Sequence, residues 1–111
     1  MTTCEPLRLE RNSIFESTFL YKDSYRVPVD LTGLVNDADF TISDDQGVDL
    51  WVGSVTSGEI TPLYDEGRFE LLISELVIDE FDFNRAKYRF RIKWISKGWQ
   101  SLGDGDVIFD D

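Results

Sequence analysis

The clearest pattern in the chain is an alternation of hydrophobic and polar positions with a period of two, which is typical of β-strands that bury one face. The alternation is most regular in residues 86–96. Its hydrophobic row is Tyr88, Phe90, Ile92 and Trp94, and its polar row is Lys87, Arg89, Arg91 and Lys93. A shift of register by one residue would place four cations in the core, so the register of this strand is strongly specified.

The same alternation predicts strands through the rest of the chain, separated by turns. The predicted hydrophobic rows are Phe15, Ser17, Phe19 and Tyr21; Leu34, Asn36, Ala38, Phe40 and Ile42; Val48, Leu50 and Val52; Phe69, Leu71 and Ile73; and Val107 and Phe109. The sequence DDQG at residues 44–47 supplies a glycine and local hydrogen-bond acceptors, as a tight turn requires. Asp65, Glu66 and Gly67 give a second turn of this kind.

The stretch PVDLTG, residues 28–33, predicts a structured crossover between two strands. Pro28 removes a backbone donor, so the preceding strand ends before it or lies at an edge. Asp30 and Thr32 can bond nearby backbone groups, and Gly33 can adopt a conformation closed to other residues. We expect Leu31 and its neighbour Val29 to plug the open end of the fold.

Residues 74–83 are the one segment in which a short helix competes with a strand. Leu76, Val77, Glu80 and Phe81 fall at one-turn spacing behind Ser74, a residue type that caps helix N-termini well. About seven to eight short strands separated by turn signals predict an all-β fold: an antiparallel, Ig-like β-sandwich, with one short helix allowed near residues 75–82. The 111 residues fit a single domain, residues 1–111.

Composition narrows the chemistry that the chain can perform. Hydrophobic residues make up 41% of it, enough for a core, and no run reaches the roughly eighteen apolar residues of a membrane span. The N-terminus lacks the basic and apolar regions of a signal peptide, which predicts synthesis in a cytoplasm. The single cysteine, Cys4, predicts a free thiol. The absence of histidine excludes Ser-His-Asp and Cys-His catalysis and imidazole metal sites, so we expect no enzyme and no cofactor.

The formal net charge of −11 predicts a surface that repels phosphate backbones and anionic membranes, so neither nucleic acid nor a membrane is an expected partner. Residues 36–83 hold thirteen acidic residues and one basic residue, Arg68. The cationic row Lys87, Arg89, Arg91 and Lys93 is a candidate interface for an acidic neighbour. The alternative is a solvated face whose cations pair across the sheet, each exposed pair contributing about 0.2 to 1 kcal/mol.

Two tryptophans fall outside the hydrophobic rows and are further candidate interface residues. Trp51 alternates with Val48, Leu50 and Val52, and Trp99 lies in the turn-like stretch KGWQ. Exposed aromatic rings stack on sugars or anchor protein interfaces. The alternative is that each ring covers the second face of the sheet or packs under a loop.

Clustered carboxylates raise the question of a metal site. Asp44, Asp45 and Asp49 surround a glycine-containing turn, and hard cations such as Ca²⁺ prefer such oxygens. Their spacing matches no EF-hand, so we predict a solvated hairpin turn and no metal. The same interpretation applies to Asp104 and Asp106.

The order of motifs carries a family resemblance. SIFESTFLYKD is followed by PVDLTG, then by EGRFELLIS with ELVIDEF, and finally by YRFRIKW before a last strand that contains glycine. This order resembles small β-sandwich domains of baseplate, tail and fibre-associated proteins of tailed bacteriophages. The resemblance implies a non-enzymatic structural component of the virion, made in the host cytoplasm. Its partners would be other virion proteins and copies of itself. The alternatives are a carbohydrate-binding module and a capsid decoration or assembly protein.

Overall fold

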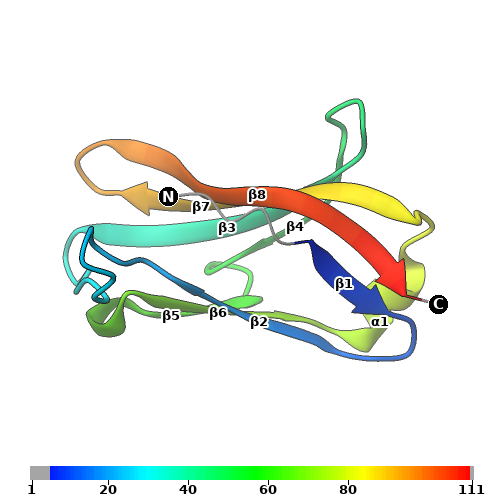
Figure 1. The fold of residues 1–111 in the computed structure, drawn as a ribbon, viewed down its shortest axis with the longest axis horizontal. Helices are drawn as coiled ribbons and strands as arrows, with labels where there is room; N and C mark the ends of the chain where they lie inside the picture. The colour runs from blue at the N-terminus through cyan, green and yellow to red at the C-terminus, as the bar shows by residue number, and fades with distance from the viewer. Residues whose placement is uncertain (1–5, 111) are drawn as a thin grey trace.

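The computed structural model describes residues 6–110, which form two layers of strands that run along a long axis of 39 Å. Figure 1 shows the two layers edge on. The strands are β1 (Leu7–Glu10), β2 (Phe15–Leu20), β3 (Val35–Ser43), β4 (Asp49–Ser54), β5 (Ile60–Leu63), β6 (Arg68–Ile73), β7 (Arg85–Trp94) and β8 (Gly98–Asp110). A 3-10 turn (Tyr64–Glu66) precedes β6, and the helix α1 (Glu75–Glu80) joins β6 to β7.

The strand order makes this an Ig-like β-sandwich. One sheet has the order β1-β8-β7-β3-β4, and the other has the order β2-β6-β5. The predicted sandwich of seven to eight strands with one short helix is therefore confirmed. One strand pair departs from the antiparallel expectation, because β1 runs parallel to the C-terminal part of β8 (Figure 1).

Four phenylalanines from the two sheets form the centre of the core. Phe40, Phe69 and Phe90 are fully buried, and Phe19 packs on them from β2. The rings of Phe19 and Phe90 stack with centroids 4.3 Å apart. This aromatic stack joins the two sheets, and such a pair contributes about 0.5 to 1.5 kcal/mol beyond the burial of its area.

The crossover at residues 28–33 has the predicted form. The side chain of Leu31 is completely buried, and its backbone N–H donates to the carbonyl oxygen of Tyr64 at 2.7 Å. The Asp30 carboxylate accepts the N–H of Thr32 at 2.9 Å, and hydrogen bonds from the side chain and the backbone of Thr32 lower the pKa of Asp30. Gly33 has the positive φ, 76°, that the turn requires. Leu31 thus closes the end of the sandwich.

The predicted hydrophobic row of β3 is wrong at its start. Val35 is buried, whereas Leu34 is half exposed. The pairing of β3 with β7 shifts register between Val35 and Asp37, so one extra residue there changes which row faces the core. From Ala38 onward the predicted row faces the core.

The predicted orientation of β4 is also wrong. Val48, Leu50 and Val52 are exposed, and the opposite row, with Trp51, faces the interior. The Trp51 ring packs edge-on against Phe40 and Phe81, with centroids 6.3 and 6.4 Å away. Gly53 makes room for it, because a Cβ there would lie 2.6 Å from the indole. Burial of the larger indole decides which face of this edge strand points inward.

The helix α1 begins where the sequence predicts, with Ser74 as its N-cap, and its side chain accepts the N–H of Val77 at 3.4 Å. Its buried residue is Ile78, and Phe81 follows at the C-cap. The predicted inward face is wrong at Leu76, whose side chain is 79% exposed. In a helix of only six residues, packing against the neighbouring strands determines which side faces inward, and here Ile78 points at the core.

Candidate functional site

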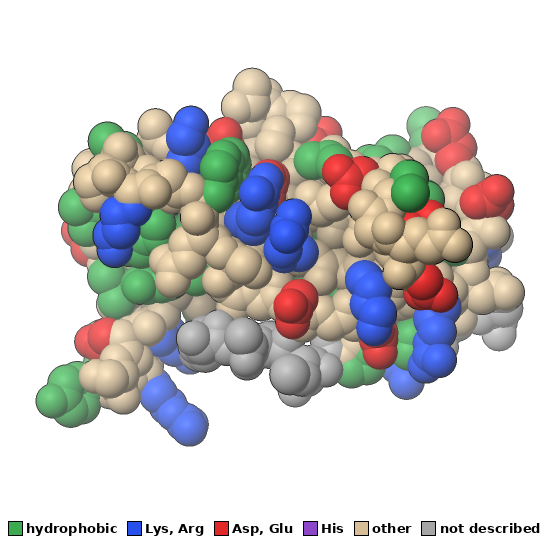
Figure 2. Space-filling view, turned by 90° about the horizontal axis from the view of Figure 1, so that it is seen from above, with side chains coloured by type: hydrophobic (Ala, Val, Ile, Leu, Met, Phe, Trp, Pro, Cys, Tyr) green, Lys and Arg blue, Asp and Glu red, His purple; other side chains and the backbone are tan. Residues whose placement is uncertain are grey.

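The predicted cationic row lies along β7 on the outer face of the five-stranded sheet, as expected from its alternation with the core row. Figure 2 looks onto this face, where Lys and Arg side chains lie among acidic and hydrophobic ones. Lys87, Arg89 and Lys93 are exposed, and Arg91 is half buried. The row is flanked on both sides, because β3 and β8 pair with β7. The charges of the neighbouring strands therefore decide how much of the row is available to a partner.

Arg91 is the most constrained cation of the row. Its Nε donates to Asp39 Oδ1 at 2.9 Å and its Nη2 donates to Asp39 Oδ2, which joins β7 to β3 by a bidentate pair. The hydrogen bond to Asp39 raises the pKa of Arg91. The guanidinium carbon also lies 4.5 Å from the centroid of the Trp99 ring on β8, and Lys93 Nζ lies 5.9 Å from it. The structure thus brings together three of the predicted interface residues.

Lys87 is paired on the other side of the row. Its Nζ lies 2.6 Å from Asp106 Oδ1 on β8, and both side chains remain well exposed. This hydrogen bond raises the pKa of Lys87 and lowers that of Asp106. Arg89, between the two pairs, makes no hydrogen bond or ion pair with the described residues 6–110. It lines a hollow of about 430 Å³ together with Thr41, Ser43, Asp49, Lys87 and Asp104.

The exposed aliphatic side chains of β4 border the same face. Leu50 and Val52 point outward on this strand, and Val48 is exposed in the turn before it. Thr41 pairs with Val52 on one side and with Arg89 on the other, so the aliphatic strip lies one strand away from the cationic row. Sequence reasoning missed this surface because it placed these residues in the core. The signal that could have found it was the large indole in the alternate row.

Trp51 does not contribute to an exposed aromatic surface, since its ring packs inward. Trp99 is 41% exposed and lies on β8, which β7 and β3 separate from β4. The outer face therefore carries an aliphatic strip on β4, an ionic centre on β3 and β7, and one indole on β8. It combines apolar, charged and aromatic groups, as protein interfaces do.

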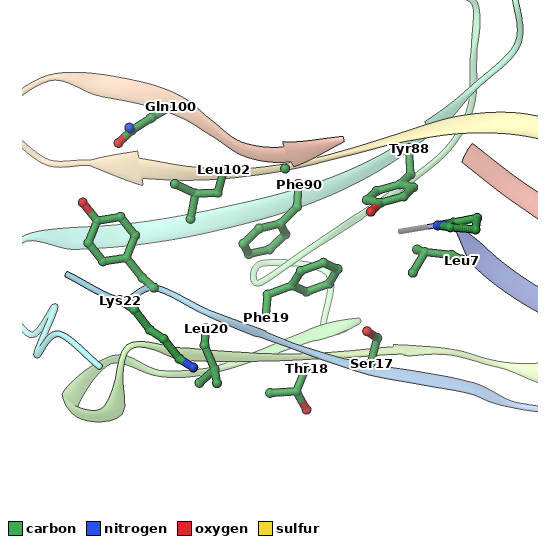
Figure 3. Close-up of a pocket in the computed structure, with 13 residues that line it drawn as sticks. Leu7, Ser17, Thr18, Phe19, Leu20, Lys22, Tyr88, Phe90, Gln100 and Leu102 are labelled. Carbon is green, nitrogen blue, oxygen red and sulfur yellow. The ribbon is translucent and has the colours of Figure 1, made fainter. Parts of the chain in front are cut away.

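A second concave region lies between the sheets, beside β2 and β8. Its volume is about 420 Å³, and its lining is mainly aromatic and aliphatic, including Phe19, Phe90 and Leu102. Figure 3 shows the Phe19 and Phe90 rings facing each other in this groove, with Gln100 and Lys22 farther out. Among the described residues of the lining, Lys22 is the one charged side chain, so these residues provide no acid and base pair.

One of the clustered carboxylates, Asp44, binds the backbone of its own turn. Asp44 Oδ1 accepts the N–H groups of Gln46 and Val48, both at 2.9 Å, and so holds the hairpin between β3 and β4. Asp106 pairs with Lys87. Cys4 lies outside the described residues.

Comparisons with known proteins assign the chain to no family. No family model matches the chain, and no curated protein matches it by sequence. Among solved structures, extracellular domains 3-5 of Drosophila OTK are similar, with a TM-score of 0.44 and 10% identity. The match covers 94% of this chain and 31% of that one, so this chain spans about a third of its length. Within residues 6–110, no helix has the length and apolar character needed to cross a bilayer.

Proposed function

We propose that the protein is a non-enzymatic structural subunit that works through protein–protein interfaces. The observation that carries the proposal is the outer face of the five-stranded sheet. There the aliphatic strip of Leu50, Val52 and Val48 is exposed beside a fixed set of charges. Exposed apolar groups beside a rim of polar groups are typical of a surface that another protein covers.

The charges on this face would contribute more to the orientation of a bound partner than to the affinity for it. The pairs of Arg91 with Asp39 and of Lys87 with Asp106 neutralise much of the row internally. Arg89 remains available to a carboxylate of a neighbour, and an unpaired charge at an interface mainly selects the partner and its register. The edge strand β4 adds backbone groups on its open side that can pair with another strand.

The assembly that we propose is the virion of a tailed bacteriophage, at the tail, baseplate or fibre attachment. The resemblance of PVDLTG and of the order of motifs supports this placement. The test is mass spectrometry of purified mature particles, followed by labelling of the protein for electron microscopy. A capsid decoration protein would be found on the head, and an assembly factor would be absent from mature particles. Absence would reject a virion component.

The interface itself is tested by the double variant Leu50→Ser/Val52→Ser, with Ile95→Ser as the control. Ile95 is an exposed isoleucine in the turn between β7 and β8. We expect the double variant to fold and to be incorporated poorly into particles, while the control is incorporated normally. Normal incorporation of the double variant would reject the outer face as the interface.

A carbohydrate-binding module is the second candidate, and the exposed ring of Trp99 favours it. The other expected platform, Trp51, packs inward. One face of the Trp99 ring is also covered by Arg91. Calorimetric titration with a panel of glycans, repeated with Trp99→Ala, tests this function. Binding that is lost in the variant would support it over the structural role.

A further inference from the structure

Residues 22–28 form a rigid projection at one end of the sandwich. Lys22 and Pro28 pair as an isolated bridge, and the N–H of Asp23 donates to the carbonyl oxygen of Val27 at 3.0 Å. Asp23 Oδ1 in turn accepts the N–H groups of Tyr25 and Val27, at 2.8 and 3.0 Å. The N–H of Arg26 donates to the carbonyl oxygen of Asp23 at 3.0 Å. Four such bonds within seven residues restrict the conformations open to this segment before it meets any partner.

This projection exposes the residue types that contribute most to protein interfaces. Tyr25 is 86% exposed, and Val27 and Arg26 beside it are also exposed. Arg26 has a φ of 62°, which is uncommon for a residue other than glycine. Tyr and Arg dominate interface hot spots, and a preformed loop loses little entropy on binding. We call residues 22–28 the projection.

The opposite end of the molecule exposes aliphatic side chains among carboxylates. Leu76 on α1 is 79% exposed, and Ile14 and Leu72 are exposed on the same sheet surface, because Leu72 pairs with Glu16 in the β2–β6 ladder. The turn before β2 is attached to α1: Asp79 Oδ1 accepts the N–H of Asn12 at 3.0 Å, and Arg11 donates to two carbonyl oxygens at the end of the helix. We call this surface the acceptor end; its exposed carboxylates are Glu16, Glu75, Asp79 and Glu80.

The two surfaces are complementary and cannot meet within one molecule. Figure 1 shows the β2–β3 connection and α1 at opposite ends of a body 39 Å long. The projection offers an aromatic ring, an aliphatic side chain and two cations, Lys22 and Arg26, while its carboxylate, Asp23, accepts hydrogen bonds from its own backbone. The acceptor end offers aliphatic side chains and four carboxylates, and its cation, Arg11, donates to carbonyl oxygens at the end of α1.

We propose that the projection of one molecule docks on the acceptor end of a second copy of this chain. Tyr25 covers the aliphatic surface around Leu76, and Arg26 lies among its carboxylates. This contact is head-to-tail, so repetition gives a ring or a filament. The inference rests on the proposed structural role and specifies one of its interfaces.

The test uses two variants of the full chain that each remove one side of the contact. The projection variant is Tyr25→Ser/Arg26→Glu, and the acceptor variant is Leu76→Glu. Lys97→Glu, an exposed cation in the turn between β7 and β8, is the control for the first. Ile95→Glu, an exposed aliphatic residue in the same turn, is the control for the second. Analytical ultracentrifugation of each protein alone, from micromolar to near-millimolar concentration, measures association.

We expect the natural chain and both controls to form oligomers that grow with concentration and weaken with salt. Each of the two variants should associate at least tenfold more weakly. A mixture of the two variants should form dimers that do not grow further, because one intact projection and one intact acceptor end remain. A two-fold contact through a single shared surface would give no such complementation.

Three results would overturn the inference: a natural chain that stays monomeric throughout, a variant that associates as strongly as its control, or a mixture without dimers. All the altered side chains are exposed, and circular dichroism with thermal melts checks that each variant folds. If Leu76→Glu did not fold, Leu76→Ser would replace it. A monomeric natural chain that is nevertheless present in particles would reject this contact and leave the proposed function standing. Self-association of a chain that is absent from particles would support this contact and reject the proposed function.

Discussion

Replacement of Leu31 by alanine should destabilise the protein far more than the same replacement three residues later. Leu31 is 0% exposed at the end of the core, whereas Leu34 is 50% exposed. Loss of three buried carbons removes about 2.4 kcal/mol of transfer free energy at about 0.8 kcal/mol per methylene. A residual void of roughly 40 Å³ adds about 1 kcal/mol at about 24 cal/mol per Å³. The expected loss of unfolding free energy is therefore about 3.5 kcal/mol.

The Leu34→Ala variant removes the same atoms from a site that is half in water and leaves no closed void. Its expected cost is about 1 kcal/mol or less. The difference between the variants, about 2.5 kcal/mol, corresponds to roughly 10 °C in Tm for a domain of this size. The assay is urea unfolding followed by tryptophan fluorescence, with thermal melts as a second measurement.

The dependence of free energy on urea should keep the same slope in both variants, because the surface exposed on unfolding hardly changes. Equal destabilisation by the two replacements would refute the reasoning. Such a result would mean that Leu31 does not close the sandwich, or that the start of β3 has a different register.

Three more replacements test particular contacts. Gly67→Ala should lower the free energy of unfolding by more than about 2 kcal/mol, because Gly67 has a φ of 62° and a Cβ would lie 2.5 Å from a backbone oxygen of the crossover. Gly58→Ala, with open space around it, should lower it by only about 1 kcal/mol. Equal melting temperatures of the two variants would contradict this. Asp106→Asn should lower Tm at neutral pH. The folded pKa of Asp106 is depressed, so the stabilising effect of its lysine partner is present above the ordinary carboxyl pKa and is lost as pH falls through the folded value; a difference in Tm that persists in strong acid would argue against the pair. Trp51→Ala should cost about 2 kcal/mol and Trp99→Ala less than about 1 kcal/mol, measured by urea unfolding, because the first ring packs on the core and the second lies on the surface; the reverse order would show that the orientation of β4 is wrong.

The candidate surfaces were predictable to different degrees. The cationic row of β7 follows from its alternation with a strongly hydrophobic row, so its position on the outer face could be predicted. Which cations are paired could not, because Asp39 is 52 residues away from Arg91 in the chain and the pairing depends on the register of β3 with β7. The exposure of Tyr25 was equally hidden, since nothing in KDSYRVP distinguishes a side chain in solvent from one that covers a sheet.

The sequence alone determined the elements whose two rows differ sharply in polarity. In β7 one row is hydrophobic and the other cationic, and in β6 the outer row carries Arg68 and Glu70, so only one orientation of each strand avoids burying charge. Ser74 likewise marked the helix start by local chemistry. The tertiary structure decided the cases in which both rows are hydrophobic. In β4 the choice between Trp51 and the aliphatic row is settled by the Phe40 and Phe81 rings, because a period of two defines the rows but not which of them faces the partner sheet.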